Sequence, residues 1–246
     1  MDVGASLTWT SPALPYLTSE NSTIPLSNAQ GALLAASSSI SGIIALLMCP
    51  LIMDQIGRKY TILVLGFIQL LSKICIYVAH NYTFLFILRL LVGVGTTGMI
   101  AFLALYIGEI AAENIRGRFL ILNKICVNLG SFLMAIAGAF LPYNPMNIVA
   151  ITIPLIAMLL FPIMEETPYY YLMKGQEKEA TETLTKLSGE KSVEIVTANI
   201  ERMKSAILEG QNSKKSSFRE LFSDRSSRRA LIIKMIKKFL ATVVHP

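Results

Sequence analysis

The sequence predicts an all-α protein that crosses a membrane several times. Its 246 residues are 53% hydrophobic and only 15% charged, and the mean hydropathy is +0.56. A soluble domain usually carries about a quarter of charged residues, so a large water-soluble core is not expected. Five stretches are long and apolar enough to cross a hydrocarbon layer of about 30 Å as helices. They are residues 31–53, 60–78, 84–107, 119–141 and 146–164.

The first residues form a shorter apolar segment. Residues 3–17 contain Pro12 and Pro15, and they lack the basic front and the small-residue cleavage site of a secretory signal. We expect them to be the outer part of a first membrane helix whose beginning is missing. Together with the five longer stretches they make a transmembrane bundle over residues 1–164.

The turns between the spans carry positive charge on one side only. Residues 18–30, 79–83 and 142–145 contain no Lys or Arg. The two alternate turns contain Arg58, Lys59, Arg116 and Arg118. Short basic loops face the cytoplasm, so the sequence predicts that the basic turns are cytoplasmic and that the loops without Lys or Arg are on the outer side. The sequons at Asn21 and Asn81 both fall in outer loops, and Asn21 is the predicted glycosylation site because Asn81 lies very close to the membrane.

Residues 165–229 are expected to form a cytoplasmic helical linker. Thr167 followed by Pro168 is a typical helix start, and residues 176–187 end at a Ser-Gly stop signal. Further on, the apolar stripe Val193, Val196, Ile200, Met203 and Ile207 has helical spacing, and Ser217 with Glu220 forms a capping box. Residues 210–217 are predicted to be a flexible joint, and residues 230–246 a partial or divergent start of a seventh helix.

Charged residues inside a membrane are costly, so they indicate function. Arg89 and Glu109 lie twenty positions apart, roughly 30 Å along a helix, and cannot pair with each other. Glu109 is instead expected to meet Arg58, Arg116 and Glu166 at the cytoplasmic ends of the helices. The alternative is that these are ordinary interfacial charges that extend into water. Lys73, near the outer end of its span, is expected to extend outward in the same way.

Small residues recur every three or four positions in the span that contains Arg89, which lets neighbouring helices approach closely. They are Gly93, Thr97, Ala101, Ala104 and Gly108. The segment 93–98 also matches the dinucleotide pattern G-x-G-x-x-G, but no strand precedes it and it lies within a membrane helix.

Other classes of function find no support in the composition. The net charge of +6 comes with basic residues next to the helices, where membrane topology accounts for them, so nucleic-acid binding is not expected. The cysteines lie in or beside apolar spans without metal-ligand spacing, and the two histidines have no nucleophile beside them. We expect no enzyme activity, cofactor or metal.

Four motifs carry a family resemblance. Residues 54–59 resemble the D-x-x-G-R-R/K loop of the major facilitator superfamily. Arg89 with Gly93 and Gly95, and then residues 106–109 and 116–117, resemble the fourth-span signature of its sugar porter branch. Residues 166–168 and 220–222 resemble that branch's P-E-S-P-R and E-L-F elements. Residues 9–14 and 168–172 are further similar to insect facilitated trehalose transporters.

The resemblance implies a twelve-helix transporter of two six-helix bundles, with a midplane sugar site and alternating access. This chain would supply the N-terminal bundle and the linker of a truncated form. The implied gating and charge network comprises Asp54, Gly57, Arg58, Lys59, Arg89, Glu109, Arg116 and Glu166. Lys124 stands where sugar porters usually place a sugar-binding glutamine. It either faces the cavity and alters selectivity or extends to the cytoplasmic edge.

The chain also departs from the family pattern. The family pattern has a glycine where this chain has Pro50, and prolines where it has Ala104 and Ala112. Tyr169 stands where P-E-S-P-R has arginine, which leaves the network one charge short. Two functions remain open. One is facilitative transport of trehalose or a hexose, which the resemblance implies takes place in the plasma membrane. The other is a non-transporting membrane partner of a C-terminal half or another transporter chain.

Overall fold

The computed structural model describes residues 1–111, 113–161, 164–188, 196–205 and 207–208, with their side chains except at 49–51, 113 and 114. The chain divides into two compact units, Met1–Gly189 and Glu190–Pro246. The described part of the first unit contains helices and no strand, as predicted. These helices are α1 (Asp2–Thr8), α2 (Thr10–Leu17), α3 (Asn28–Ile56), α4 (Arg58–Tyr77), α5 (Tyr82–Ile110), α6 (Glu113–Phe140), α7 (Tyr143–Leu160), α8 (Pro168–Met173) and α9 (Glu177–Ser188).

Helices α3 to α7 confirm the five predicted spans, and each is long and apolar enough to cross a membrane. Their ends differ from the prediction by a few residues because local caps decide them. Helix α3 begins at Asn28, since Ser27 and Gln30 form a reciprocal capping box. Helix α5 runs on to Ile110, so Glu109 lies within the helix rather than beyond it. Helix α7 ends at Leu160, short of the predicted 164.

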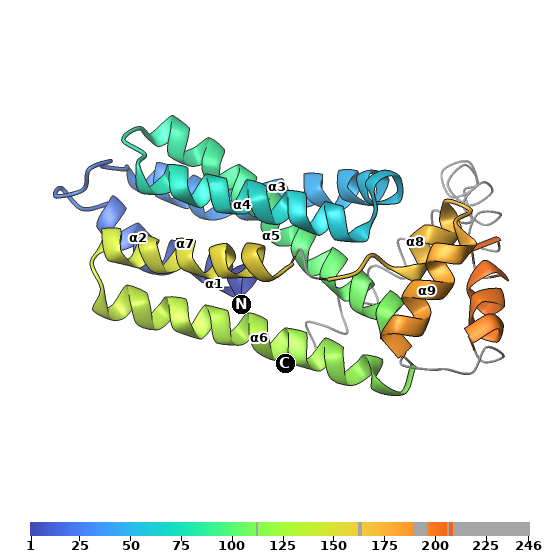
Figure 1. Cartoon of the computed structure of the whole chain (residues 1–246). Helices are drawn as coiled ribbons and strands as arrows, with labels where there is room; N and C mark the ends of the chain where they lie inside the picture. Colours follow the sequence, from blue (N-terminus) through green and yellow to red (C-terminus); the bar gives the residue numbers. More distant parts are fainter. Residues whose placement is uncertain (112, 162–163, 189–195, 206, 209–246) are drawn as a thin grey trace, which may run out of the picture. The chain divides into compact units, whose positions relative to one another are not determined.

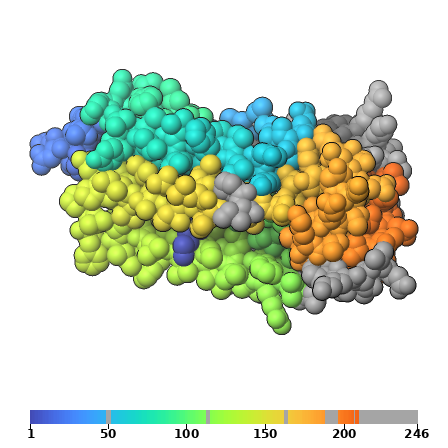
Figure 2. Space-filling model, in the orientation of Figure 1, coloured from blue at the N-terminus to red at the C-terminus, as the bar shows by residue number. Residues whose placement is uncertain are grey.

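The five long helices run up and down in sequence order (Figure 1). The connections after α2, α4 and α6, which contain no Lys or Arg, therefore lie at one end of the bundle, and the turns with Arg58 and Arg116 lie at the other. This alternation is the one that the loop charges predict. Helices α4 and α7 pack side by side on one face (Figure 2).

Helices α1 and α2 follow one another with Trp9 in helical conformation between them. Helix α1 packs against α6 with backbone touching backbone: a Cβ on Gly4 would overlap the carbonyl oxygen of Val127, and one on Gly130 would overlap that of Met1. Ser131 Oγ also donates a hydrogen bond of 3.1 Å to the Gly4 carbonyl. Small residues thus permit the close approach of these two helices.

The predicted small-residue stripe of α5 serves the same purpose along part of its length. A Cβ on Gly93 would overlap Ser41 Oγ and come within 2.8 Å of Ser38 Cα, so α3 and α5 meet here at backbone distance. One turn further on, Thr97 of α5 packs against Gly42 of α3. The stripe does not extend to Gly108, where a Cβ would have no neighbour within 4 Å.

The interior contains two apolar clusters. One gathers around Trp9, Leu34, Leu85 and Met146, and the other around Ile62, Leu65, Phe102 and Tyr106. Large apolar side chains also point outward from the long helices, among them Leu47, Phe132, Phe140 and Leu159. A bundle with apolar groups on both its inside and its outside is suited to lipid rather than water.

The predicted linker helices are present where the structure describes them. Thr167 caps α8 by accepting a hydrogen bond from the Tyr170 amide, with Pro168 at the first position, and α9 matches the predicted 176–187 closely. In the second unit, residues 196–205 are helical and Val196, Ile200 and Ile207 are buried. The remaining linker predictions lie outside the described residues. They concern Val193, the joint at 210–217, the capping box at 217–220 and residues 230–246. The boundaries at 164 and 229 stay a prediction.

Glycines 93 and 108 of the same helix offer a matched test of this packing. Gly93→Ala should lower the free energy of unfolding by about 1–3 kcal/mol, because α3 must move away. Gly108→Ala should be neutral or raise it by about 0.5–1 kcal/mol, since only helix propensity changes. Thermal unfolding of the detergent-solubilised protein measures both, and equal effects would contradict the close α3–α5 contact.

Candidate functional site

The turn between α3 and α4 places Arg58 at the centre of a group of polar and aromatic side chains. Gly57 adopts φ +98°, a conformation that other residues rarely take, and ends α3 so that α4 can begin at once. The Arg58 side chain then points inward and is only 3% exposed. Its Nε donates hydrogen bonds of 3.0 and 3.2 Å to the two carboxylate oxygens of Glu109 on α5. Asp54 lies 3.8 Å from Nη1.

Glu166 binds the start of α4 through backbone amides. Its carboxylate accepts hydrogen bonds from the N–H groups of Arg58 and Lys59, each at 3.1 Å, and from that of Thr167 at 2.9 Å. An anion at the amino end of a helix is favoured by unpaired N–H groups and by the helix dipole. A Cβ on Gly57 would overlap this carboxylate, so the glycine is required for space as well as for conformation.

Tyrosines complete the group. The Arg58 guanidinium lies 5.2 Å from the ring centre of Tyr169 and 6.0 Å from that of Tyr170. The residue that departs from the family arginine thus gives Arg58 an aromatic face in place of a further charge, a contact worth about 0.5–2 kcal/mol. Tyr170 Oη also donates to the Gln55 carbonyl at 3.3 Å, and Tyr106 Oη to that of Glu165 at 2.6 Å. We call Asp54, Arg58, Glu109, Glu166 and Tyr169 the Arg58 cluster.

Arg116 of the predicted network lies apart from this cluster. Arg116 forms no ion pair with any side chain that the structure describes, and its Nη2 donates a long hydrogen bond of 3.4 Å to the Ala111 carbonyl. The expected meeting of Arg116 with Glu109 is therefore not present in this conformation. Lys59 contributes its backbone amide to Glu166. The gating role of the network stays a prediction.

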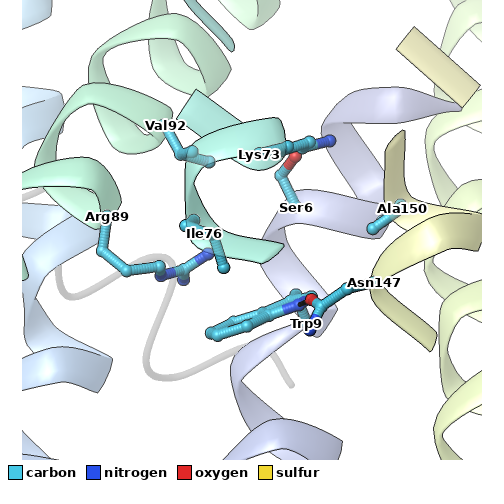
Figure 3. A pocket seen from close by; sticks show the side chains of 9 residues that line it. Ser6, Trp9, Lys73, Ile76, Arg89, Val92, Asn147 and Ala150 are labelled. Atoms are coloured by element: carbon cyan, nitrogen blue, oxygen red, sulfur yellow. Dashed lines mark hydrogen bonds between the residues drawn. The ribbon is translucent and has the colours of Figure 1, made fainter. Parts of the chain in front are cut away.

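Arg89 lies in a different place, within the bundle. It is 2% exposed, and its Nη2 donates hydrogen bonds of 2.6 Å to Thr10 Oγ1 and 3.0 Å to Ser38 Oγ. Its guanidinium also lies 4.7 Å from the centre of the Trp9 ring, and Trp9 Nε1 donates to Asn147 Oδ1 at 2.7 Å. Arg89, Trp9 and Asn147 line a small pocket between α1, α4, α5 and α7 (Figure 3).

The prediction for Lys73 is wrong. Its side chain does not extend outward; it is 7% exposed and pairs inside the bundle with the carboxylate of Asp2. A lysine in a low-dielectric interior is far more stable beside an opposite charge than without one, and Asp2 on α1 supplies it. Gln69, one turn before Lys73, donates to Ser6 Oγ at 3.0 Å and Thr96 Oγ1 at 2.9 Å, so α1, α4 and α5 share one polar contact.

Three residues around Arg89 and Lys73 are not predicted as site residues. Trp9 appears in the sequence prediction only as part of a motif, and Asp2 and Asn147 do not appear there. A lone tryptophan and polar residues within apolar helices were the available signals. Lys124 is exposed on α6 and does not line the pocket, and Asn21 is exposed in the loop before α3. Neither position tests the sugar-binding or glycosylation prediction.

A bundle of long apolar helices with a buried ion pair inside and a charge cluster at one end is typical of a multi-pass membrane protein. The chain belongs to the sugar (and other) transporter family, whose model matches residues 6–243. This is a family of transporters and not of enzymes.

Known proteins agree with this assignment. The chain is 28% identical over 166 residues to the sugar transporter ERD6 of Arabidopsis thaliana, covering 68% of this chain and 34% of ERD6. It is 30% identical over 194 residues to the facilitated trehalose transporter Tret1 of Apis mellifera ligustica, covering 76% of this chain and 38% of Tret1. It therefore spans between about a quarter and a half of the length of the curated relatives that it matches.

The fold is that of the major facilitator superfamily. The structure of the proton:xylose symporter XylE bound to 6-bromo-6-deoxy-D-glucose matches with a TM-score of 0.73 at 18% identity, covering 90% of this chain and 53% of XylE. A partially occluded inward-open conformation of XylE from E. coli matches with a TM-score of 0.74 at 16% identity, covering 86% and 56%. The predicted all-α major facilitator bundle is thus confirmed.

Neighbouring glutamates provide a matched test of the Arg58 cluster. Glu166→Gln should lower the free energy of unfolding by about 2 kcal/mol, because three charge-assisted hydrogen bonds become neutral ones. Glu165→Gln should change it by less than about 0.5 kcal/mol, since the Glu165 pair with Lys186 is exposed. Thermal unfolding in detergent checks the pair, and a Glu166 variant as stable as the Glu165 variant would contradict the structural role of Glu166.

Proposed function

We propose that this chain supplies the first six-helix bundle of a facilitative sugar transporter that moves trehalose or a hexose across the plasma membrane by alternating access. The family and the relatives named for sugar and trehalose transport support the substrate class. The single observation that carries the mechanism is the Arg58 cluster, because it ties helix ends together through bonds that can be broken and remade.

The cluster connects segments that an alternating-access cycle would separate. Arg58 at the start of α4 is bound to Glu109 on α5 and packs on Tyr169 of α8. Glu166, which lies just before α8 in the sequence, accepts a hydrogen bond from the backbone at the start of α4. In water each contact would be weak, but burial makes the contacts stronger and makes their loss costly. We infer that the intact cluster stabilises one conformation at the basic end of the bundle and that its rupture accompanies the other.

The sugar would bind between this bundle and a second one. Lys124 is exposed on α6, and a lysine there could donate hydrogen bonds to sugar hydroxyls but not accept them. The basic turns would face the cytosol and Asn21 would carry a glycan on the outer side, in keeping with its exposure in the opposite loop. Asn81 is less suited, because its side chain caps α5 by accepting from the Thr83 amide at 3.0 Å.

A second candidate is a membrane protein that does not transport by itself and that pairs with a C-terminal half or another transporter chain. The apolar side chains that α6 and α7 expose, such as Phe132 and Leu159, favour it. In this case the Arg58 cluster would fix the shape of the bundle for its partner.

Uptake of radiolabelled trehalose and glucose into vesicles tests the proposal. The chain should give saturable uptake when it is expressed alone, and the measurement is repeated with a co-expressed second bundle of a relative. Glu109→Gln should reduce the initial rate about tenfold, which corresponds to about 1.4 kcal/mol and to one charge-assisted hydrogen bond. Glu165→Gln should leave it unchanged.

The two candidates predict different results. Uptake only in the presence of the second bundle would favour the partner role for the isolated chain. Absence of uptake under both conditions, with normal expression and folding, would refute sugar transport. An unchanged rate in Glu109→Gln would refute the role of the Arg58 cluster in the cycle.

A further inference from the structure

The pocket around Trp9 contains hydrogen-bond donors that have no acceptor. Arg89 and Asn147, each 2% exposed, line it from α5 and α7. Figure 3 shows the guanidinium and the amide pointing toward Trp9 from opposite sides. The Nε of Arg89 and the Nδ2 of Asn147 are buried and make no hydrogen bond of ordinary geometry to a described residue. The hydroxyl of Tyr143, near Asn147, is likewise buried without a hydrogen bond, so it does not satisfy these donors. Buried donors without partners are rare in folded proteins, so these two indicate a missing acceptor.

The same pocket has more positive than negative charge. Lys73 lines it too, but Lys73 is paired with the carboxylate of Asp2. Arg89 forms no salt bridge within the described part of the chain, and its hydrogen bonds go to neutral hydroxyls. An arginine keeps its charge in a protein. The pocket therefore has two cations and one carboxylate, and one positive charge remains unbalanced among buried side chains.

We propose that this pocket binds a small monovalent anion, with chloride as the simplest member of the class. An anion would accept hydrogen bonds from Arg89 Nε and Asn147 Nδ2 and would balance the remaining charge in one step. A water molecule or a sugar hydroxyl could accept the same bonds but would leave the charge unbalanced. The pocket is small and partly lined by Ile76 and Val92, which suits a compact, weakly hydrated ion. The anion would act as a structural counter-ion and not as the transported sugar.

Trp9 reports on the pocket directly. It is the only tryptophan of the chain, it is 4% exposed, and both Arg89 and Asn147 contact it. Bromide quenches indole fluorescence on contact, whereas a buried ring is protected from collisions with ions in solution. We therefore use bromide as the probe, with the purified full chain in detergent and gluconate added to keep the ionic strength constant. Bromide should quench Trp9 along a saturable curve, and chloride should reverse the quenching.

Two variants and one control separate the pocket from general salt effects. Asn147→Asp keeps the acceptor for Trp9 Nε1 and places a fixed carboxylate in the pocket, so the saturable quenching should be lost while the fold is kept. Arg89→Gln removes the unbalanced charge and should also lose it. Arg118→Gln removes an exposed charge at the basic end of the bundle and should retain the quenching of the unaltered chain.

The outcomes decide the proposal without reference to transport. Saturable quenching that is reversed by chloride and absent from Asn147→Asp supports the anion site, whether or not the chain moves sugar. Quenching that rises linearly with bromide in the unaltered chain would overturn it. Saturable quenching of equal size in Asn147→Asp, shown to be folded by its circular dichroism, would place the anion elsewhere and would overturn it as well.

Discussion

The hydrocarbon around the bundle is the constraint on which the rest of the structure depends. Lipid offers no hydrogen bonds, so each backbone group must be satisfied within its helix and each charge must find a partner inside the bundle or at its ends. Lys73 follows this rule by pairing with Asp2 inside the bundle. Arg89 is buried too, and its hydrogen bonds go to the hydroxyls of Thr10 and Ser38. Many large apolar side chains meanwhile remain exposed on the long helices.

The ends of the helices meet the same constraint in another way. Short turns leave little room for caps, and Glu166 supplies an anion to the exposed N–H groups of α4 while Arg58 reaches inward to Glu109. Gly57 allows both, because it has neither the conformational restriction nor the bulk of another residue. Tyr169 shows that a ring can take a place where the family pattern has a charge, since it packs on Arg58.

The parts of the fold that the sequence predicts correctly are those that depend on local residue chemistry or on periodic hydropathy. The five spans, the Thr167 cap and the up-and-down order follow from hydropathy, turn chemistry and loop charge. Contacts between distant helices were harder, because they depend on how each helix is rotated about its axis. The Trp9 to Asn147 hydrogen bond joins residues 138 positions apart. Lys73 was assigned to the outside because hydropathy gives depth along a helix but not the face on which a residue lies. The family resemblance located Arg58, Glu109 and Glu166, but it could not show that Arg116 stays apart from them.

Cysteine-accessibility labelling tests the central claim most directly. In a chain whose native cysteines are replaced by serine, single cysteines at Asn21 and at Lys59 would be exposed to a membrane-impermeant maleimide in intact cells and in permeabilised cells. The account predicts that the Asn21 position reacts in intact cells and that the Lys59 position reacts only after permeabilisation. Labelling of both positions from the same side of the membrane would contradict the alternating helices and the sidedness of the Arg58 cluster.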